Sequence, residues 1–383
     1  MKIATGCVVL VLCAAASAGA QNGVERGGFV TRLGNDTIAV ERFVRTRDSI
    51  AGQVVVRTPM TRRYSYVARL GPDGNVTTYS ATVLESGAAD APVLARFDAE
   101  LRGDSVRSTN SQHDTTRTNA EAVPRGSVPL LQPTYALHEI LVHRAIAAAG
   151  KPVAFSWWVV GDGPGDTGTV IQAKPGLVLI RAPTDTMRIE TDATGEIVHA
   201  ADPGGTLQAT ASRVPYPDLD KLAAMFAARD AKGKSLGVLS PRDTVRATVG
   251  GTHVLVDYGR PSRRGRTIFG GVVPYNSVWR TGANAATTLV VDHDVMLGDT
   301  KVPAGEYTLF SVPTPDRWTL IVSKKTKEWG TDYDSTADLV RIPMQTGSGQ
   351  QVELFTISIE PQGALAFAWD TRVGKISLRP AGS

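Results

Sequence analysis

Cationic and aromatic side chains gather in one glycine-rich stretch, DYGRPSRRGRTIFGGVVPYNSVWRTGAN, which covers residues 257–284. A guanidinium group presents a rigid fork of donors that matches a carboxylate or a phosphate, and it also stacks on aromatic rings. No activated nucleophile, metal-ligand set or pair of carboxylates accompanies this stretch. It therefore predicts a surface for a small polar or anionic ligand or a glycan, with candidate binding residues Tyr258, Arg260, Arg266, Trp279, Arg280 and Asn284.

A structural role is the alternative for the same stretch. Arg280 could hold loop carbonyls or an aspartate, while Gly282 and Ala283 would be small because two backbones approach closely there. Long loops must satisfy their own backbone polar groups, which favours this alternative. We expect Arg280 to hold the loops first and the neighbouring arginines and rings to form a binding surface second.

A second cluster, DYDSTAD at residues 332–338, combines three aspartates with a tyrosine. Carboxylates can gather around calcium, but the glycine and closing glutamate of a calcium loop are missing, and aspartate is common in solvated turns. An aspartate that pairs with an arginine is the more useful hypothesis. Asp332 and Tyr333 therefore join the candidate binding residues, and Asp332 or Asp338 is the candidate base if the protein is a hydrolase.

Two other motifs predict no chemistry. In HEILVH, His138 and His143 are five residues apart, about 140° around a helix, so they cannot share one metal ion. Glu139 and His143, four residues apart, are expected to form a surface pair. In GKSLG, Ser235 follows a helix instead of a strand, which indicates a linker and not a nucleophile elbow. The sequence predicts neither a metal site nor a cofactor.

The surrounding segments predict a mainly β protein. Alternating apolar residues with hairpin turns predict antiparallel strands in residues 28–101, and a solvated strand pair or a mobile loop in 103–133. Helical periodicity predicts a helix near 134–149 and a second one near 217–232. From residue 238, about eight short strands without a helix predict an all-β sandwich or jelly-roll-like domain. The first domain is expected to be an antiparallel sheet with one or two helices.

The domain division follows from these segments and from the N-terminus. Residues 1–20, with one lysine, a short apolar run and Ala18-Gly19-Ala20, are typical of a signal peptide cleaved after Ala20. Residues 21–217 form the expected N-terminal domain, 218–237 a helix and linker, and 238–383 the C-terminal domain. A periplasmic or extracellular location follows, with no membrane-spanning helix in the mature chain. Both cysteines lie within the signal peptide, so the mature chain has no disulfide.

A net charge of +4 is too small to indicate a nucleic-acid partner. The sequence does not indicate an oligomeric state.

Residues 238–380 resemble a bacterial family, domain of unknown function 2911 (DUF2911). The resemblance rests on SPRDTVRATVGGTHVLVDYGRPSRRGRTIFGG, VPYNSVWRTGANAATTL, VPAGEYTLFSVP, WTLIVS and YDSTADLVRIPM, in this order. It implies an exported protein with a β-rich domain and no established reaction, and it leaves the N-terminal domain unplaced. The motif residues that carry over are Tyr258, Arg260, Pro261, Gly265, Arg266, Phe269, Gly270, Trp279, Arg280, Gly282, Asn284, Gly305, Tyr307 and Trp318.

One position departs from the family pattern. Relatives usually carry a glutamate after GAN, where this sequence has Ala285. If that glutamate acts as an acid, a base or a ligand in relatives, this protein lacks the function.

Three hypotheses about function follow. The first is an exported, non-enzymatic protein whose C-terminal domain binds a small polar or anionic ligand or a glycan. The second is an envelope hydrolase that uses Asp332 or Asp338 beside Arg280, with its base within about 3 Å of the proton it removes. The third is an envelope scaffold whose open strand edges contact other proteins.

Overall fold

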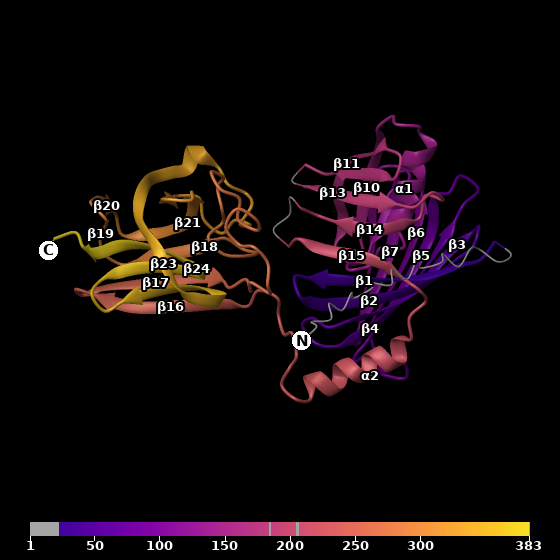
Figure 1. The fold of residues 1–383 in the computed structure, drawn as a ribbon, viewed down its shortest axis with the longest axis horizontal. Helices are drawn as coiled ribbons and strands as arrows, with labels where there is room; N and C mark the ends of the chain where they lie inside the picture. The colour runs from indigo at the N-terminus through magenta and orange to yellow at the C-terminus, as the bar shows by residue number, and fades with distance from the viewer. Residues whose placement is uncertain (1–22, 184, 204–206, 383) are drawn as a thin grey trace, which may run out of the picture.

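The structure is a computed structural model that describes residues 23–183, 185–203 and 207–382. Within these residues the strands form two separate sheets, of fifteen and nine strands, and there are two α-helices. Figure 1 shows the two sheets as neighbouring bodies with α2 beneath the first. The prediction of a mainly β protein is therefore confirmed. The predicted signal peptide lies outside the described residues.

The N-terminal sheet has the spatial order β8-β7-β6-β5-β4-β3-β2-β1-β15-β14-β13-β12-β11-β10-β9. Neighbouring strands are antiparallel except for the short β9, which runs parallel to β10. Its strands are β1 (Glu25–Leu33), β2 (Asp36–Arg45), β3 (Ser49–Val56), β4 (Arg62–Leu70), β5 (Val76–Leu84), β6 (Val93–Arg102), β7 (Ser105–Gln112), β8 (Thr115–Ala122), β9 (Val128–Leu130), β10 (Val153–Val159), β11 (Gly163–Lys174), β12 (Leu177–Arg181), β13 (Thr186–Thr191), β14 (Ile197–Ala201) and β15 (Ala209–Val214).

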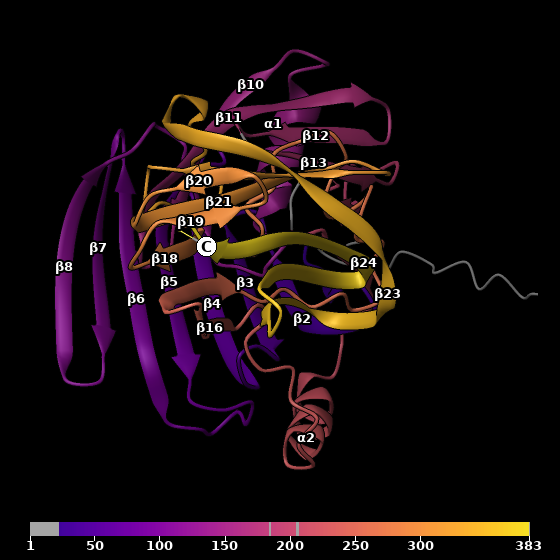
Figure 2. The same cartoon turned by 90° about the vertical axis from the view of Figure 1, so that its left-hand side faces the viewer.

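This sheet curls until its two ends approach each other. Trp158 on β10 donates a hydrogen bond from Nε1 to Glu121 Oε2 on β8, at 3.2 Å. The curl encloses the first helix, α1 (His138–Ala147), and Figure 2 shows the tall curved strands β4 to β8 on one side of it. Leu137, Ile140 and Leu141 of the helix region are buried in the apolar core, as their helical spacing predicts.

Residues 103–133 were expected to form either a solvated strand pair or a mobile loop. Within them, residues 105–122 form the β7–β8 hairpin. All but one of the β8 residues are exposed, because β8 is the outermost strand of the sheet. The lack of an apolar face explains why the sequence pattern did not distinguish the two structures.

The second helix, α2 (Leu219–Asp230), packs on the outer face of β2 and β3. Asp218 caps its N-terminus by accepting hydrogen bonds from two backbone N–H groups, both at 3.1 Å. Leu219, Ala223 and Phe226 are its buried residues. They pack against valines of the sheet, so the helix is tied to the N-terminal sheet. No helix in the described ranges is long and apolar enough to cross a membrane.

The C-terminal sheet has the order β16-β17-β18-β21-β22-β23-β24-β19-β20. β23 contacts β16 and β17, which are not its neighbours in this order, so the sheet folds over on itself. The aromatic and aliphatic side chains between the two parts of the sheet form one core. Its strands are β16 (Arg242–Val249), β17 (Thr252–Gly259), β18 (Thr287–Val291), β19 (Val295–Leu297), β20 (Thr300–Val302), β21 (Gly305–Pro313), β22 (Trp318–Ser323), β23 (Asp338–Glu360) and β24 (Ala364–Pro380).

The last two strands are longer than the sequence pattern indicates. The alternating segment QVELFTISIE is typical of one short strand, but it is the second part of β23, which begins at Asp338. The segments GALAFAWD and KISLRP each have the pattern of a short strand, and they form one strand, β24. Register shifts between Ser348 and Thr356 mark irregular pairing in the middle of the hairpin. Irregular pairing interrupts the alternation of buried and exposed residues. The sequence pattern therefore predicts separate short strands where the chain forms one long strand.

The two sheets contact each other through turns. In the β1–β2 turn, the N–H of Asn35 donates to the carbonyl of Arg264 at 2.9 Å, and Asp36 Oδ2 accepts from Arg264 Nη1 at 2.6 Å. A Cβ on Gly34 would lie 2.0 Å from the Arg264 carbonyl oxygen, so only glycine permits this approach. These contacts place the arginine-rich loop, residues 260–286 between β17 and β18, against the N-terminal sheet.

Candidate functional site

A cavity of about 280 Å³ lies where the arginine-rich loop meets the N-terminal sheet. Pockets that bind small molecules often occur at such domain junctions. The lining residues come from both sheets and from the segment between them. They are Leu33 and Leu207 from the N-terminal side, Leu239 and Ser240 from the connecting segment, and Pro261, Arg266, Val272, Trp279, Arg280, Gly282, Ala283, Asn284, Trp329 and Trp369 from the C-terminal side.

Trp279 forms part of the cavity wall and is itself 5% exposed. Its backbone exchanges two hydrogen bonds with Ser311 on β21, at 2.7 and 2.9 Å, which fixes the loop to the sheet. The indole ring stacks on Trp369 at 5.9 Å between centroids and meets the edge of Phe355 at 5.0 Å. Such aromatic contacts hold the ring firmly, so the wall is preformed.

Arg280 follows on the same wall and is bound to its own loop. Its Nη1 donates to the carbonyl of Asn284 at 3.4 Å, and the same carbonyl accepts from the N–H of Gly330 at 3.0 Å. A Cβ on Gly330 would lie 2.5 Å from Arg280 Cδ, so the arginine side chain lies directly over this glycine. Burial lowers the pKa of Arg280. The guanidinium still carries its charge at neutral pH.

Arg266 reaches the cavity from the neighbouring part of the loop. Its guanidinium donates to three backbone carbonyls, those of Arg263, Ser262 and Leu207, the last at 2.9 Å across the domain junction. Burial lowers the pKa of Arg266, and the nearby Arg264 contributes in the same direction. Arg266 therefore brings positive charge to the cavity while it stabilises the loop.

Two other candidate residues have structural surroundings. Tyr258 is 1% exposed in the C-terminal core, where its hydroxyl donates to the carbonyl of Ile357 at 3.3 Å. Arg260 donates to the carbonyl of Phe355, to Asp243 and to Thr356, at 3.0 to 3.1 Å. Neither residue lines the cavity. Their side chains hold β16, β17 and β23 together.

The acidic cluster forms its own hydrogen-bond network, and none of its members lines the cavity. Asp338 Oδ2 accepts from the hydroxyl of Tyr333 at 2.7 Å and pairs with Arg341 at 2.8 Å. Asp334 caps the short 3-10 turn at Ser335–Ala337. Asp332 is exposed and donates its backbone N–H to Trp329. The pairing of an aspartate with an arginine thus involves Asp338 and Arg341, and no member of the cluster lines the cavity beside Arg280.

Trp329 is one of the lining residues that the sequence motifs did not indicate. It is 52% exposed at the cavity, in a turn whose bridge to Ala285 places it beside the loop of Asn284. Ala285, where the family resemblance leads to the expectation of a glutamate, accepts a hydrogen bond from Arg242 through its carbonyl. The only sequence signal for Trp329 is a large aromatic residue next to glycine in a polar segment, KKTKEWG.

The prediction for the first helix was wrong in one respect. Glu139 is not on the surface with His143 but is fully buried, where it pairs with Arg45 and with Arg213, the latter at 2.8 Å. The helix lies inside the curled sheet, so its polar face meets charged strands instead of water. Within the described part of the chain, no group of three His, Cys, Asp or Glu residues could hold a metal ion.

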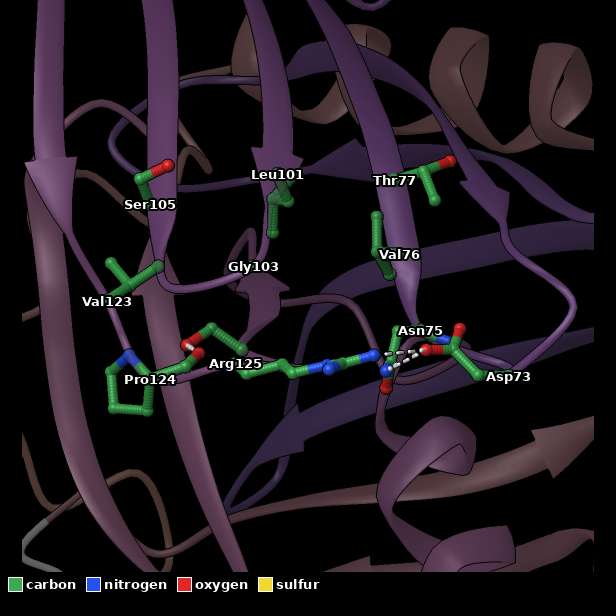
Figure 3. A pocket seen from close by; sticks show the side chains of 12 residues that line it. Asp73, Asn75, Val76, Thr77, Leu101, Gly103, Ser105, Val123, Pro124 and Arg125 are labelled. Atoms are coloured by element: carbon green, nitrogen blue, oxygen red, sulfur yellow. Dashed lines mark hydrogen bonds and ion pairs between the residues drawn. The ribbon is translucent and has the colours of Figure 1, made fainter.

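A second cavity of about 280 Å³ opens at one end of the N-terminal sheet (Figure 3). Val76, Leu101 and Val123 give it an apolar lining, and Arg125 extends across it towards Asp73. The Arg125 Nη2 and Asp73 Oδ2 atoms lie 3.6 Å apart, and Asn75 also donates to Asp73 at 2.7 Å. The two charged groups here compensate each other.

Comparison with known proteins agrees with the sequence motifs. Residues 240–378 match the family described as "Protein of unknown function (DUF2911)", so the predicted resemblance is confirmed. A crystal structure from Nitrosomonas europaea, provisionally described as AttH (NE1406), covers 94% of each chain at 11% identity and a TM-score of 0.12. A TM-score of this size carries no argument about fold or function. No curated protein matches the chain.

Proposed function

We propose that the protein binds a small anionic ligand or an acidic sugar in the cavity at the domain junction. The observation that supports this most is the charge of the wall. Among the described residues that line the cavity, two are arginines and none is an aspartate or a glutamate. Guanidinium groups on a concave surface favour a carboxylate or a phosphate, to which they donate two parallel hydrogen bonds.

Partial burial strengthens this argument. Arg266 and Arg280 both have their pKa lowered by burial, so water solvates their charges less well than on an open surface. A bound anion would offset this loss of solvation, because charge pairs interact more strongly where water is excluded. The cavity therefore favours a negatively charged ligand over a neutral one of the same shape.

The aromatic residues favour a ligand with a ring. Trp329 is half exposed at the cavity, and Trp279 and Trp369 form a stacked pair in its wall. A tryptophan face binds flat apolar surfaces, and the amide of Asn284 and the hydroxyl of Ser240 can exchange hydrogen bonds with hydroxyl groups. An acidic sugar combines a ring, hydroxyl groups and a carboxylate.

The test is a thermal-shift titration of the full chain with phosphate, glucuronate and glucose. Ligands that bind the folded state raise the melting temperature as their concentration passes the Kd. We expect glucuronate to raise it and glucose not to. The Arg280→Met variant keeps the aliphatic part of the side chain over Gly330 and removes the guanidinium group. We expect it to weaken the binding of glucuronate at least about 10-fold, which corresponds to the loss of one hydrogen bond to a charged group.

The matched control is Arg317→Met, which removes an exposed arginine in the β21–β22 turn outside the cavity. Its affinity for glucuronate should equal that of the unmodified chain. If the two variants lose affinity equally, binding depends on overall charge and not on the cavity. If Arg280→Met unfolds the C-terminal domain, as judged by tryptophan fluorescence, the side chain is mainly a structural support.

A further inference from the structure

We infer that the ligand is an organic anion with an apolar body, bound between the two domains, and that the N-terminal domain supplies the apolar wall. This inference rests on the proposed function and adds to it a ligand class and a role for the first domain. Its basis is the division of the lining residues. The C-terminal side contributes the guanidinium groups and the tryptophans, whereas Leu33 and Leu207 come from the N-terminal side.

The N-terminal wall belongs to well-defined elements. Leu33 is the last residue of β1 and is 2% exposed, while Leu207 precedes β15 and is 45% exposed. Leu239 of the connecting segment lies against the same cavity. An exposed leucine at the mouth of a cationic cavity loses water contact when an apolar group covers it, which stabilises the complex. A compact inorganic anion would leave this wall uncovered.

Backbone contacts hold this wall in position. The Leu207 carbonyl accepts from Arg266 Nη1 at 2.9 Å, so one cationic residue of the cavity is bound directly to the apolar wall. Asp36 and Arg264 form an ion pair between the same two turns, with 2.6 Å between Oδ2 and Nη1. The Arg264 side chain is only 9% exposed. A Cβ on Gly265 would lie 2.3 Å from Asn35 Nδ2, so the two turns are packed without a gap.

The cavity in this arrangement has a cationic side and an apolar side. A carboxylate fits the first, through Arg266 and Arg280, and an aromatic or alkyl group fits the second, through Leu33 and Leu207. A ligand that touches both sides also bridges the domains. Its binding therefore favours the docked arrangement, and the isolated C-terminal domain provides only part of the site.

The experiment compares two probes, glucuronate and phenyl β-glucuronide, by calorimetric titration of the full chain. Both carry the same carboxylate and sugar ring, and only the second has an apolar body. We expect phenyl β-glucuronide to bind at least about 10-fold more tightly. The Leu207→Ser variant should weaken phenyl β-glucuronide about 10-fold and leave glucuronate within about two-fold. Val198→Ser is the matched control, since Val198 is 44% exposed on β14 and does not line the cavity.

The outcomes separate the two proposals. If Arg280→Met abolishes the binding of both probes while Leu207→Ser changes neither, the site belongs to the C-terminal domain alone and this inference is wrong. If phosphate or glucuronate binds through Arg280 and the phenyl group adds no affinity, the proposed function holds without the apolar wall. If no probe binds the unmodified chain, both proposals fail.

Discussion

The contacts of each charged side chain show whether the residue stabilises the fold or faces the cavity. Arg260 and Arg280 lie in the same motif, yet Arg260 donates to three partners on two other strands, while Arg280 lies on a cavity wall. Glu139 is the clearest structural case. It is fully buried between Arg45 and Arg213, and Arg213 also pairs with Glu25. Buried charges are tolerated only in such networks.

The Glu139→Gln substitution should therefore destabilise the protein strongly. It removes the negative charge between Arg45 and Arg213 but keeps the side-chain volume. Breaking a buried ion pair costs about 3 kcal/mol or more in the free energy of unfolding, because the remaining charges stay buried. Urea unfolding followed by tryptophan fluorescence measures the loss. Glu190→Gln, at an exposed position on β13, is the control and should change the midpoint little; an equal effect of both variants would contradict the role given to burial.

At the scale of secondary-structure elements, α1 is held inside the curled sheet by polar contacts as well as by apolar packing. Glu41 on β2 accepts hydrogen bonds from the backbone N–H groups of Tyr135 and Ala136, just before the helix, and from the hydroxyl of Tyr66. Burial outweighs these hydrogen bonds and raises the pKa of Glu41 to about 7. Burial also lowers the pKa of His138, on the helix itself, to about 4.

The raised pKa of Glu41 predicts a pH-dependent stability. The folded state binds this proton more tightly than the unfolded state, whose pKa is near 4.5. Its stabilising contribution is therefore complete below about pH 4.5 and is lost as the pH rises through about 7, a change of about 3 kcal/mol. The Glu41→Gln variant should lack this dependence, which urea unfolding at pH 5 and pH 8 measures as a difference from the unmodified chain.

His138 changes the stability with pH in the opposite direction to Glu41. The stability of the unmodified chain must therefore be compared with that of the Glu41→Gln variant at each pH. Its lowered pKa contributes stability that is present above about pH 6.5 and lost as the pH falls through about 4. The two effects partly cancel in the unmodified chain. Subtracting the Glu41→Gln curve removes the His138 contribution, which is common to both proteins. Parallel curves for the two proteins between pH 5 and pH 8 would show that Glu41 titrates normally.

At the scale of the whole molecule, the contact between the two sheets creates the cavity. The Gly34 turn and the Arg264 loop meet through one backbone hydrogen bond and one ion pair. The backbone of Gly34 has a φ of +57°, and a Cβ there would collide with the Arg264 carbonyl. Domain contacts of this limited size permit relative motion unless specific interactions hold them.

The Gly34→Ala substitution should separate the domains without unfolding either one. Both this variant and Gly74→Ala place alanine at a positive φ, which costs about 1 kcal/mol. A Cβ on Gly74, however, meets nothing within 4 Å, so Gly74→Ala isolates the backbone strain from the collision. Small-angle X-ray scattering should give a larger radius of gyration for Gly34→Ala alone. Equal radii for the two variants would show that the turn does not hold the domains together.

The sequence by itself determined the class of fold and the position of the arginine-rich loop in the chain. Alternating burial along each strand and helical spacing along α1 and α2 are local patterns, so they can be recognised without knowing the neighbours. The same patterns failed at the β23–β24 hairpin, where irregular pairing interrupts the alternation. They also failed at Glu139, because helical spacing does not reveal whether water or a charged strand faces the polar side.

Only the tertiary structure decided which residues share the cavity. Arg266, Trp279, Arg280 and Asn284 belong to the loop that the sequence indicated, and the structure brings them together there. Trp329 and Leu207 come from segments outside that loop, and no local pattern relates them to it. A ligand site depends on which turns lie opposite each other, and this depends on how two sheets dock. That docking is set by a few contacts between residues more than two hundred positions apart, such as Asp36 and Arg264.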